Sequence, residues 1–132
     1  MVASLARTEK ISAPLARVTA VKLGRYRTPF NAEAEADWIA AAVDLSQVDV
    51  FLSGAGGFAK LEPMYQAVAA ALAKRAGKTL EHQTYKPLCG EYHSASGFGF
   101  SIAVNLAREQ KRGVLLYTLS QRGAKALCCV QP

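Results

Sequence analysis

The sequence contains few of the residues that bind metals or form disulfide bonds. Its cysteines are only Cys89, Cys128 and Cys129, and its histidines are only His82 and His93. The odd number of cysteines and the lack of a secretory pattern argue against a disulfide framework. Because no Cys-x-x-Cys pair is present, we expect no metal site. Cys128 and Cys129 lie in an apolar run, which predicts that they pack as small strand residues.

Long apolar runs and runs of like charge are also missing. No apolar stretch reaches the roughly 18 residues that a membrane-spanning helix needs. The first ten residues carry charges where the apolar part of a secretory signal would lie, so we expect a cytoplasmic protein. The 16 basic residues exceed the 10 acidic ones and give a net charge of +6, but they are scattered. This pattern does not favour nucleic-acid binding, and it suits either a solubilising surface or an acidic protein partner.

The pattern of apolar residues predicts a layered α/β fold. A length of 132 residues, of which 51% are apolar, fits one domain over residues 1–132. Strand-like and helix-like segments alternate in the order β-α-β-α-β-α-β-β, which predicts a mixed five-stranded sheet, largely parallel, with one edge strand reversed. The predicted strands are 15–23, 48–52, 79–85, 114–119 and 124–130, and the predicted helices are 32–43, 60–76 and 94–110.

Local signals mark the ends of these elements. The side-chain oxygen of Asn31 can cap the first helix. Pro63 is tolerated because it lies in the first turn of the second helix, and Gly77 suits the C-terminal end of that helix. The four residues SQRG, 120–123, form a turn that is short enough to join the last two strands as an antiparallel hairpin.

The third predicted helix has few polar residues. It follows the stretch KPLCGEYHSASGFGFSIAVNL, 86–106, in which Asn105 is the strongly polar residue after the serines. A helix on the surface of a small domain normally carries a polar face. We therefore expect both sides of this helix to be covered, one by the sheet and the other by a partner or by a second copy of the chain.

Five residues around this stretch resemble a known family. Lys86 is followed by Gly90 four positions later, and Ala95, Ser96 and Gly97 then enter the helix. This spacing, together with the order of elements, resembles the C-terminal half of a thiolase-fold ketosynthase, of the β-ketoacyl-ACP synthase or chain-length-factor type. The resemblance covers about residues 15–132. It implies that an equivalent helix of an N-terminal half covers the outer side of the third helix.

The resemblance assigns candidate catalytic positions, and two of them are altered. Ser53 and Glu91 stand where the family has two catalytic histidines, whose neutral rings stabilise a developing oxyanion. Serine donates one weaker hydrogen bond, and an ionised carboxylate repels an enolate. Lys86 stands where the family holds a lysine that Glu91 could pair with; the alternative is a solvated surface lysine. His93 could replace a lost imidazole, or it could be a capping or surface residue.

The cysteine nucleophile of the family belongs to its N-terminal half, which precedes the matching region. Cys89 could be activated by the nearby lysine, but a packing role suits it better. The turn of Ser53, Gly54, Gly56 and Gly57 could contact a phosphopantetheine arm through its backbone N–H groups, or it could be a plain strand-to-helix turn. We expect no tightly bound cofactor; a phosphopantetheine-linked acyl thioester is the candidate ligand.

These features give three functional hypotheses. The first is a ketosynthase-like half-domain of fatty-acid or polyketide assembly that is not active alone, completes a partner, shapes the acyl pocket and contacts an acyl carrier protein. The second is a fragment of an active condensing enzyme whose other half carries the cysteine. The third is a free-standing interaction module that reuses the fold. The expected partners are a ketosynthase half or a second copy, and an acidic carrier protein.

Overall fold

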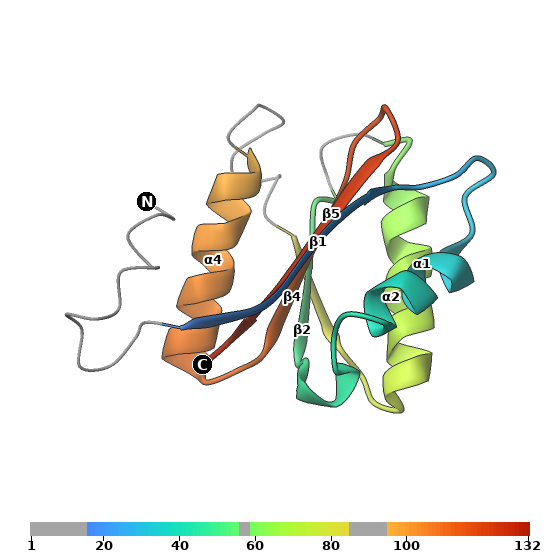
Figure 1. Ribbon diagram of the computed structural model, residues 1–132. Helices are drawn as coiled ribbons and strands as arrows, with labels where there is room; N and C mark the ends of the chain where they lie inside the picture. Colours follow the sequence, from blue (N-terminus) through green and yellow to red (C-terminus); the bar gives the residue numbers. More distant parts are fainter. Residues whose placement is uncertain (1–15, 56–58, 85–94) are drawn as a thin grey trace.

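The computed structural model describes residues 16–55, 59–84 and 95–132, and it confirms an α/β fold with a mixed five-stranded sheet (Figure 1). The predicted order of elements is confirmed within these ranges. The strands are β1 (Arg17–Arg25), β2 (Val50–Ser53), β3 (Glu81–Thr84), β4 (Val114–Leu119) and β5 (Ala124–Gln131), and the helices are α1 (Ala32–Ala40), α2 (Glu62–Ala76), α4 (Ala95–Gln110) and the 3-10 turn η2 (Leu45–Gln47).

The sheet has the strand order β1-β5-β4-β2-β3. Strand β2 pairs in parallel with both β3 and β4, whereas β5 runs antiparallel to both β4 and β1. The expectation of a reversed strand at the edge is therefore wrong, because the reversed strand β5 lies inside the sheet. The short turn holds β5 beside β4, and β1 then pairs with the edge of β5 that remains free.

The helices lie on both faces of the sheet. Helices α1 and α2 cover one face, and α4 covers the other (Figure 1). Alternate residues of the central strands therefore enter two separate cores: Phe51 and Leu115 face α1 and α2, whereas Val50 and Val114 face α4. Every residue of β2 is buried, as is typical of a strand that is covered on both sides.

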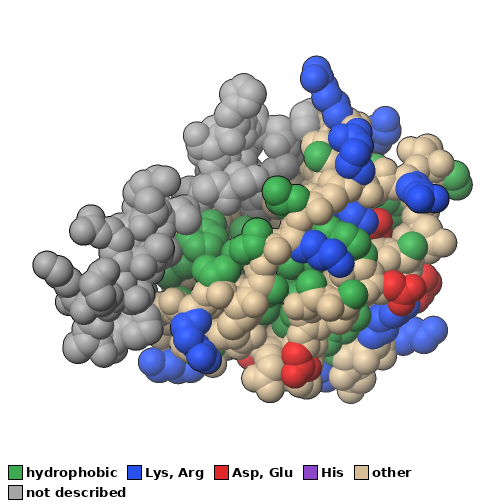
Figure 2. Space-filling view, in the orientation of Figure 1, with side chains coloured by type: hydrophobic (Ala, Val, Ile, Leu, Met, Phe, Trp, Pro, Cys, Tyr) green, Lys and Arg blue, Asp and Glu red, His purple; other side chains and the backbone are tan. Residues whose placement is uncertain are grey.

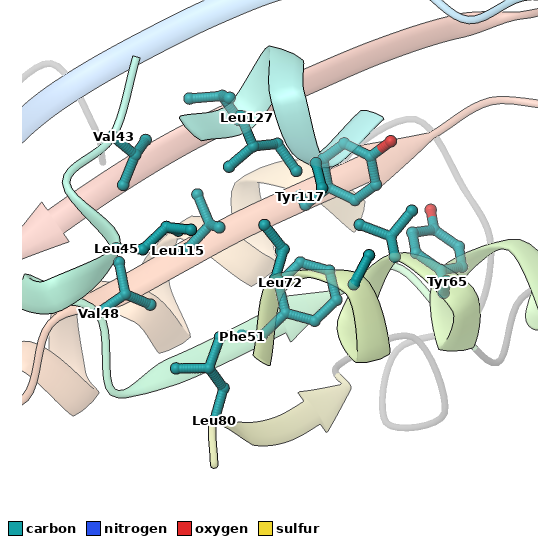
Figure 3. Packing of buried hydrophobic residues seen from close by; sticks show 14 of the residues in the cluster. Val43, Leu45, Val48, Phe51, Tyr65, Leu72, Leu80, Leu115, Tyr117 and Leu127 are labelled. Carbon is teal, nitrogen blue, oxygen red and sulfur yellow. The ribbon is translucent and has the colours of Figure 1, made fainter. Parts of the chain in front are cut away.

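The larger core lies under α1 and α2, and it is built around aromatic rings (Figure 3). The rings of Phe51 and Tyr117 are 5.9 Å apart, and Tyr65 meets Tyr117 edge-on at 6.1 Å. Edge-on contacts of this kind are favourable beyond the apolar area that they bury. The smaller core uses Ala103 and Ala107 of α4, whose short side chains allow this helix to approach the sheet closely.

Helix α1 is fixed at its N-terminus and against α2. The N–H groups of Glu33 and Ala34 donate to the Asn31 side chain at 3.0 and 3.1 Å, which confirms the predicted cap. Gly77 has a φ of 68° at the end of α2, which confirms its predicted role there. Arg75 of α2 forms ion pairs with Glu33 and with Asp37, so the two helices are held together at their exposed side.

Helix α4 has a polar side, contrary to the expectation from its sequence. Ser101, Asn105 and Arg108 are exposed, while Ile102 and Leu106 on the flank of the helix are half-buried. Residues spaced by four and three positions lie on one face of a helix, so these three side chains form one stripe directed away from the sheet. Among the described residues, the large exposed apolar side chains lie instead on β1.

None of the helices in the described parts of the chain is long and apolar enough to cross a membrane.

The junction before β4 has no room for a side chain at Gly113. A Cβ atom added there would lie 1.9 Å from the backbone oxygen of Gln47, and backbone atoms cannot move aside as a flexible side chain can. The Gly113 N–H donates to the Asp49 carboxylate at 3.0 Å, and the Gly113 carbonyl accepts from the N–H groups of Asp49 and Val50. The position therefore joins three segments of the fold.

We predict that Gly113→Ala lowers the free energy of unfolding by about 2 kcal/mol or more, because the added methyl group displaces η2 from β4. Urea denaturation followed by circular dichroism measures the change. Asn105→Ala, at an exposed helical position, is the control and should stay within about 0.5 kcal/mol of the parent chain. Equal stability of the two variants would contradict the assignment of a tight junction.

Candidate functional site

The carboxyl ends of the parallel strands β2 and β3 lie next to each other, along the side of the sheet where these strands end. Ligands in open α/β sheets commonly bind at this edge. Strand β2 ends at Ser53, which is fully buried, and Gly54 follows with its N–H donating to the Tyr117 carbonyl at 3.2 Å. Strand β3 ends at Thr84, and α4 begins at Ala95. The candidate site is built at this edge.

Ser53 is hydrogen-bonded to a histidine that the sequence did not indicate. The Oγ atom of Ser53 lies 2.7 Å from Nε2 of His82, and it also accepts a hydrogen bond from the N–H of Ala55 at 3.3 Å. With that N–H as donor, the serine still has its own proton to share with the imidazole. Ser53 and His82 therefore form one hydrogen-bonded pair across two strands.

The parallel register explains why these two side chains meet. Phe51 lies opposite His82, and Ser53 lies opposite Thr84, so Phe51, Ser53 and His82 share one face of the sheet. His82 could have been identified as a polar side chain on a strand that neighbours the strand of Ser53. To recognise that the two side chains meet, one must know the register of the two strands, which a single sequence does not provide.

His82 lies in a partly apolar environment. Its ring is 5.1 Å from the ring of Phe51, and burial lowers the pKa of His82, while the carboxylate of Glu62 acts in the opposite direction and more weakly. The imidazole is therefore neutral at neutral pH. A neutral imidazole beside a hydroxyl can pass or hold a proton, or donate a hydrogen bond to a carbonyl oxygen.

Five of the seven expected site residues lie outside the described residues. Lys86, Glu91 and His93 belong to segment 85–94, and Gly56 and Gly57 belong to segment 56–58. The roles expected for them stay predictions. The structure describes Ser53 and Gly54, both buried, and brings Ser53 to His82 rather than leaving it open at the surface.

The cysteines at the end of the chain do not provide a nucleophile. Cys129 is buried and Cys128 is half-buried, and both are free thiols of β5, as predicted. Burial, together with the neighbouring Cys129, raises the pKa of the Cys128 thiol to about 11. Since the thiolate is the reactive form, Cys128 is almost entirely unreactive at neutral pH. Cys89 lies outside the described residues.

A second polar cluster lies under α1, and no pattern in the sequence indicates it. The carboxylate of Glu35 accepts hydrogen bonds from the Lys125 ammonium at 2.9 Å and from the Tyr117 hydroxyl at 2.7 Å. Both charged side chains are more than nine-tenths buried, and Lys125 also lies 4.2 Å from the centre of the Trp38 ring. Burial and the hydrogen bond to Glu35 raise the pKa of Tyr117 far above its usual value.

This cluster fixes α1 to the sheet rather than offering an open reactive group. Glu35 comes from α1, Tyr117 from β4 and Lys125 from β5, so one carboxylate joins three elements. A buried charge with both partners in place is tolerated, whereas a buried charge that has lost its partner is strongly unfavourable.

We predict that Lys125→Met lowers the free energy of unfolding by about 3 kcal/mol, because it leaves the Glu35 carboxylate buried without its cation. The double variant Glu35→Gln/Lys125→Met should recover part of the loss. Arg108→Gln, which removes an exposed pair with Glu109, is the control and should change little. If the double variant loses as much stability as the two single variants lose together, the two residues are not coupled, and this account is contradicted.

We also predict that His82 stays unprotonated to lower pH in the folded chain than in the unfolded chain. The unfolded state then binds more protons below the ordinary histidine pKa of about 6.5, so the stability falls as the pH is lowered through that value. In the His82→Gln variant, this loss of stability at lower pH should be smaller. NMR titration of the imidazole measures the pKa directly, and a value above that of an unfolded control peptide would refute the prediction.

Comparisons with known proteins identify solved structures that have a similar fold. No protein-family model and no curated protein match this chain. Among solved structures, it is similar to the oxazolomycin ketosynthase domain of Streptomyces albus, with a TM-score of 0.70 and 14% identity over 89% of this chain and 45% of that one. It is also similar to the ishigamide ketosynthase/chain length factor, with a TM-score of 0.60 and 20% identity over 95% of this chain and 37% of that one.

A third similar structure is a type II polyketide ketosynthase bound to its acyl carrier protein, with a TM-score of 0.67 and 14% identity over 89% of this chain and 33% of that one. The human mitochondrial 3-ketoacyl-CoA thiolase follows with a TM-score of 0.56. The chain thus spans less than half the length of each of these three ketosynthase structures. The chain therefore has the thiolase-like fold.

Proposed function

We propose that this chain is a ketosynthase-like half-domain of fatty-acid or polyketide assembly that is not active alone and that completes the fold of a partner. The similarity in fold supports this proposal, and so does the share of the ketosynthase structures that the chain spans. The observation that carries it is an uncovered apolar strip on the sheet.

The strip lies on strand β1 and consists of Val18, Val21 and Leu23. These side chains are 47%, 66% and 76% exposed. Val21 lies opposite Cys128 and Val18 opposite Val130, two residues of β5 that pack towards α4. Residues that face each other on neighbouring strands point to the same side of the sheet. The strip therefore lies on the α4 side of the sheet, beside the helix.

A second half-domain is the cover that suits this surface best. Helix α4 packs over β2, β4 and the end of β5, and it leaves the α4-facing side of β1 open. A contiguous exposed apolar surface usually marks an interface. Figure 2 shows hydrophobic side chains at the surface over this part of the sheet. The occupant that we propose is a half-domain carrying the cysteine, and a second copy of this chain is the alternative outcome.

In this proposal the isolated chain lacks activity because of the residues at positions 53 and 91, Ser53 and Glu91. Both stand at positions where the resemblance places histidine, and neither supplies an imidazole. Ser53 is fully buried and its hydroxyl is engaged with His82 and with the Ala55 N–H. In this proposal the half-domain shapes the acyl pocket and leaves the nucleophile to the partner.

A second candidate function is a fragment of an active condensing enzyme. The observation that favours it is His82, which places one neutral imidazole at the carboxyl ends of β2 and β3. With the cysteine supplied by a partner, this imidazole would donate a hydrogen bond to a thioester carbonyl. Condensing activity of the reconstituted pair that is lost in His82→Gln would favour this function over the first.

The proposal extends to a carrier-bound substrate. The turn that begins at Ser53 and Gly54 would lie along a phosphopantetheine-linked acyl thioester, and the net charge of +6 would attract an acidic acyl carrier protein. One of the similar ketosynthases was solved with its acyl carrier protein. Binding that weakens steeply as salt is added would support this attraction.

We predict that the chain forms a complex heavier than its own 14.1 kDa when it is co-expressed with a cysteine-bearing ketosynthase half from a neighbouring reading frame. Leu23→Lys should abolish the complex, because it places a charge in the apolar strip. Thr19→Lys adds the same charge to the same strand outside the strip and is the matched control. Light scattering measures the mass, and strictly monomeric parent chain, alone and after co-expression, would contradict the proposal.

A further inference from the structure

A hollow of about 380 Å³ lies beside the β4–β5 turn. Three segments that are distant in sequence meet around it: the end of β1 with the loop that follows, the start of α2, and the β4–β5 turn. Its volume lies within the range of small-molecule sites. The residues that line it are Arg25, Tyr26, Thr28, Phe30, Lys60, Met64, Gln121, Arg122 and Gly123.

The charged side chains of this hollow are all positive. Arg25, Lys60 and Arg122 line it, and none of the described residues that line it is acidic. Within the described parts of the chain, the side chains of Lys60 and Arg122 take part in no ion pair, in contrast to Arg75 and Arg112, which have carboxylate partners. Figure 2 shows Lys and Arg side chains gathered at this end of the molecule. Three cations with no acidic residue in the described lining favour an anionic ligand.

Arg25 is held in place by the turn. Its Nη2 atom donates to the carbonyl of Arg122 at 2.6 Å, and it lies 3.1 Å from where a Cβ of Gly123 would be. The guanidinium is therefore positioned before any ligand arrives, and it has further N–H groups to donate. A fixed planar fork of donors is suited to phosphate oxygens.

The opposite wall of the hollow is apolar. Tyr26, Phe30 and Met64 are partly buried and pack against the main core. The rings of Tyr26 and Phe30 meet edge-on at 5.6 Å, and the Tyr26 hydroxyl donates to the carbonyl of Ser120, which holds this wall against the turn. An apolar wall beside three cations fits a ligand with an apolar body and an anionic head.

We propose that this hollow binds an organic phosphate monoester, with its phosphoryl group held by Arg25, Lys60 and Arg122 and its apolar body packed on Tyr26, Phe30 and Met64. Three cations match a phosphate that carries close to two negative charges at neutral pH better than they match a carboxylate with one. The site uses neither the α4 side of the sheet nor Ser53. This proposal therefore does not depend on the proposed ketosynthase-like function.

A neighbouring hollow of about 420 Å³ shares Arg25 and Thr28 but suits an anion less well. Its charged lining includes the buried carboxylate of Glu35, which already binds Lys125 at 2.9 Å. That carboxylate would repel a phosphate that entered this hollow. The hollow without an acidic residue is therefore the phosphate site.

Phenyl phosphate is the probe that tests this site, and calorimetric titration of the full chain measures its affinity. We expect phenyl phosphate to bind more tightly than inorganic phosphate, which lacks the apolar body, and than benzoate, which carries one charge. In NMR spectra, contacts from the phenyl protons should reach Tyr26, Phe30 and Met64. This measurement on the parent chain does not depend on any variant being folded.

Two variants and two matched controls test which residues bind the phosphoryl group of phenyl phosphate. Arg122→Gln and Lys60→Gln should each weaken the binding of phenyl phosphate about tenfold, the loss expected for one charge-assisted hydrogen bond. Arg17→Gln, at the other end of β1, and Lys74→Gln, at the other end of α2, remove the same charges away from the hollow and should change the affinity little.

Four results would overturn the proposal. Equal affinity for phenyl phosphate and inorganic phosphate would show general attraction of anions by a basic protein. Equal losses in the two variants and the two controls would show the same. Absence of binding by the parent chain, or phenyl contacts to residues outside the hollow, would show that no such site exists.

Discussion

The short turn between β4 and β5 determines how the rest of the sheet is assembled. The Ser120 hydroxyl accepts hydrogen bonds from the N–H groups of Arg122 and Ala124, and Gly123 has a φ of 94°, which favours glycine. This geometry returns the chain directly alongside β4. Strand β5 therefore enters the sheet in the reverse direction, and among the described strands β1 pairs with the far edge of β5. The apolar strip on β1 and the position of Arg25 beside the turn both follow from this pairing.

The two polar features of the interior show different uses of buried groups. Glu35, Lys125 and Tyr117 satisfy one another and connect a helix to two strands. Ser53 and His82 connect only two neighbouring strands, and they do so at the sheet edge where α/β proteins place their ligands. The first group suits a structural role, while the second keeps a neutral imidazole next to the place where the resemblance expects catalytic chemistry.

The order of elements could be predicted because it depends on local signals. The cap at Asn31, the glycine at Gly77 and the turn at 120–123 act within a few residues, and the structure confirms all three. The position of β5 inside the sheet could not be predicted, because it depends on the pairing of Arg17 with Gln131 across the whole chain. The place of His82 depends on a strand register in the same way.

The polar side of α4 follows from the spacing of its residues. Ser101, Asn105 and Arg108 are spaced by four and three positions, so they share one face of the helix, and all three are exposed. The expectation of an apolar outer face on this helix is therefore wrong, and the large exposed apolar side chains of the described residues lie on β1. For the candidate site, the sequence indicated Ser53 and Gly54, and the structure added a partner that no motif contained.

Among the described strands, β1 is the first in the sequence, and the strand that pairs with it, β5, is the last. During synthesis on the ribosome, β1 therefore cannot complete this pairing until the residues up to Gln131 have been made. Its valine and leucine side chains are exposed throughout that time, alongside backbone groups without hydrogen-bond partners from a sheet. Such a segment is a natural target for chaperones. Because the loop between β1 and β5 is long and closes slowly, the pairing of these two strands is the folding step at which the nascent chain is most exposed to aggregation.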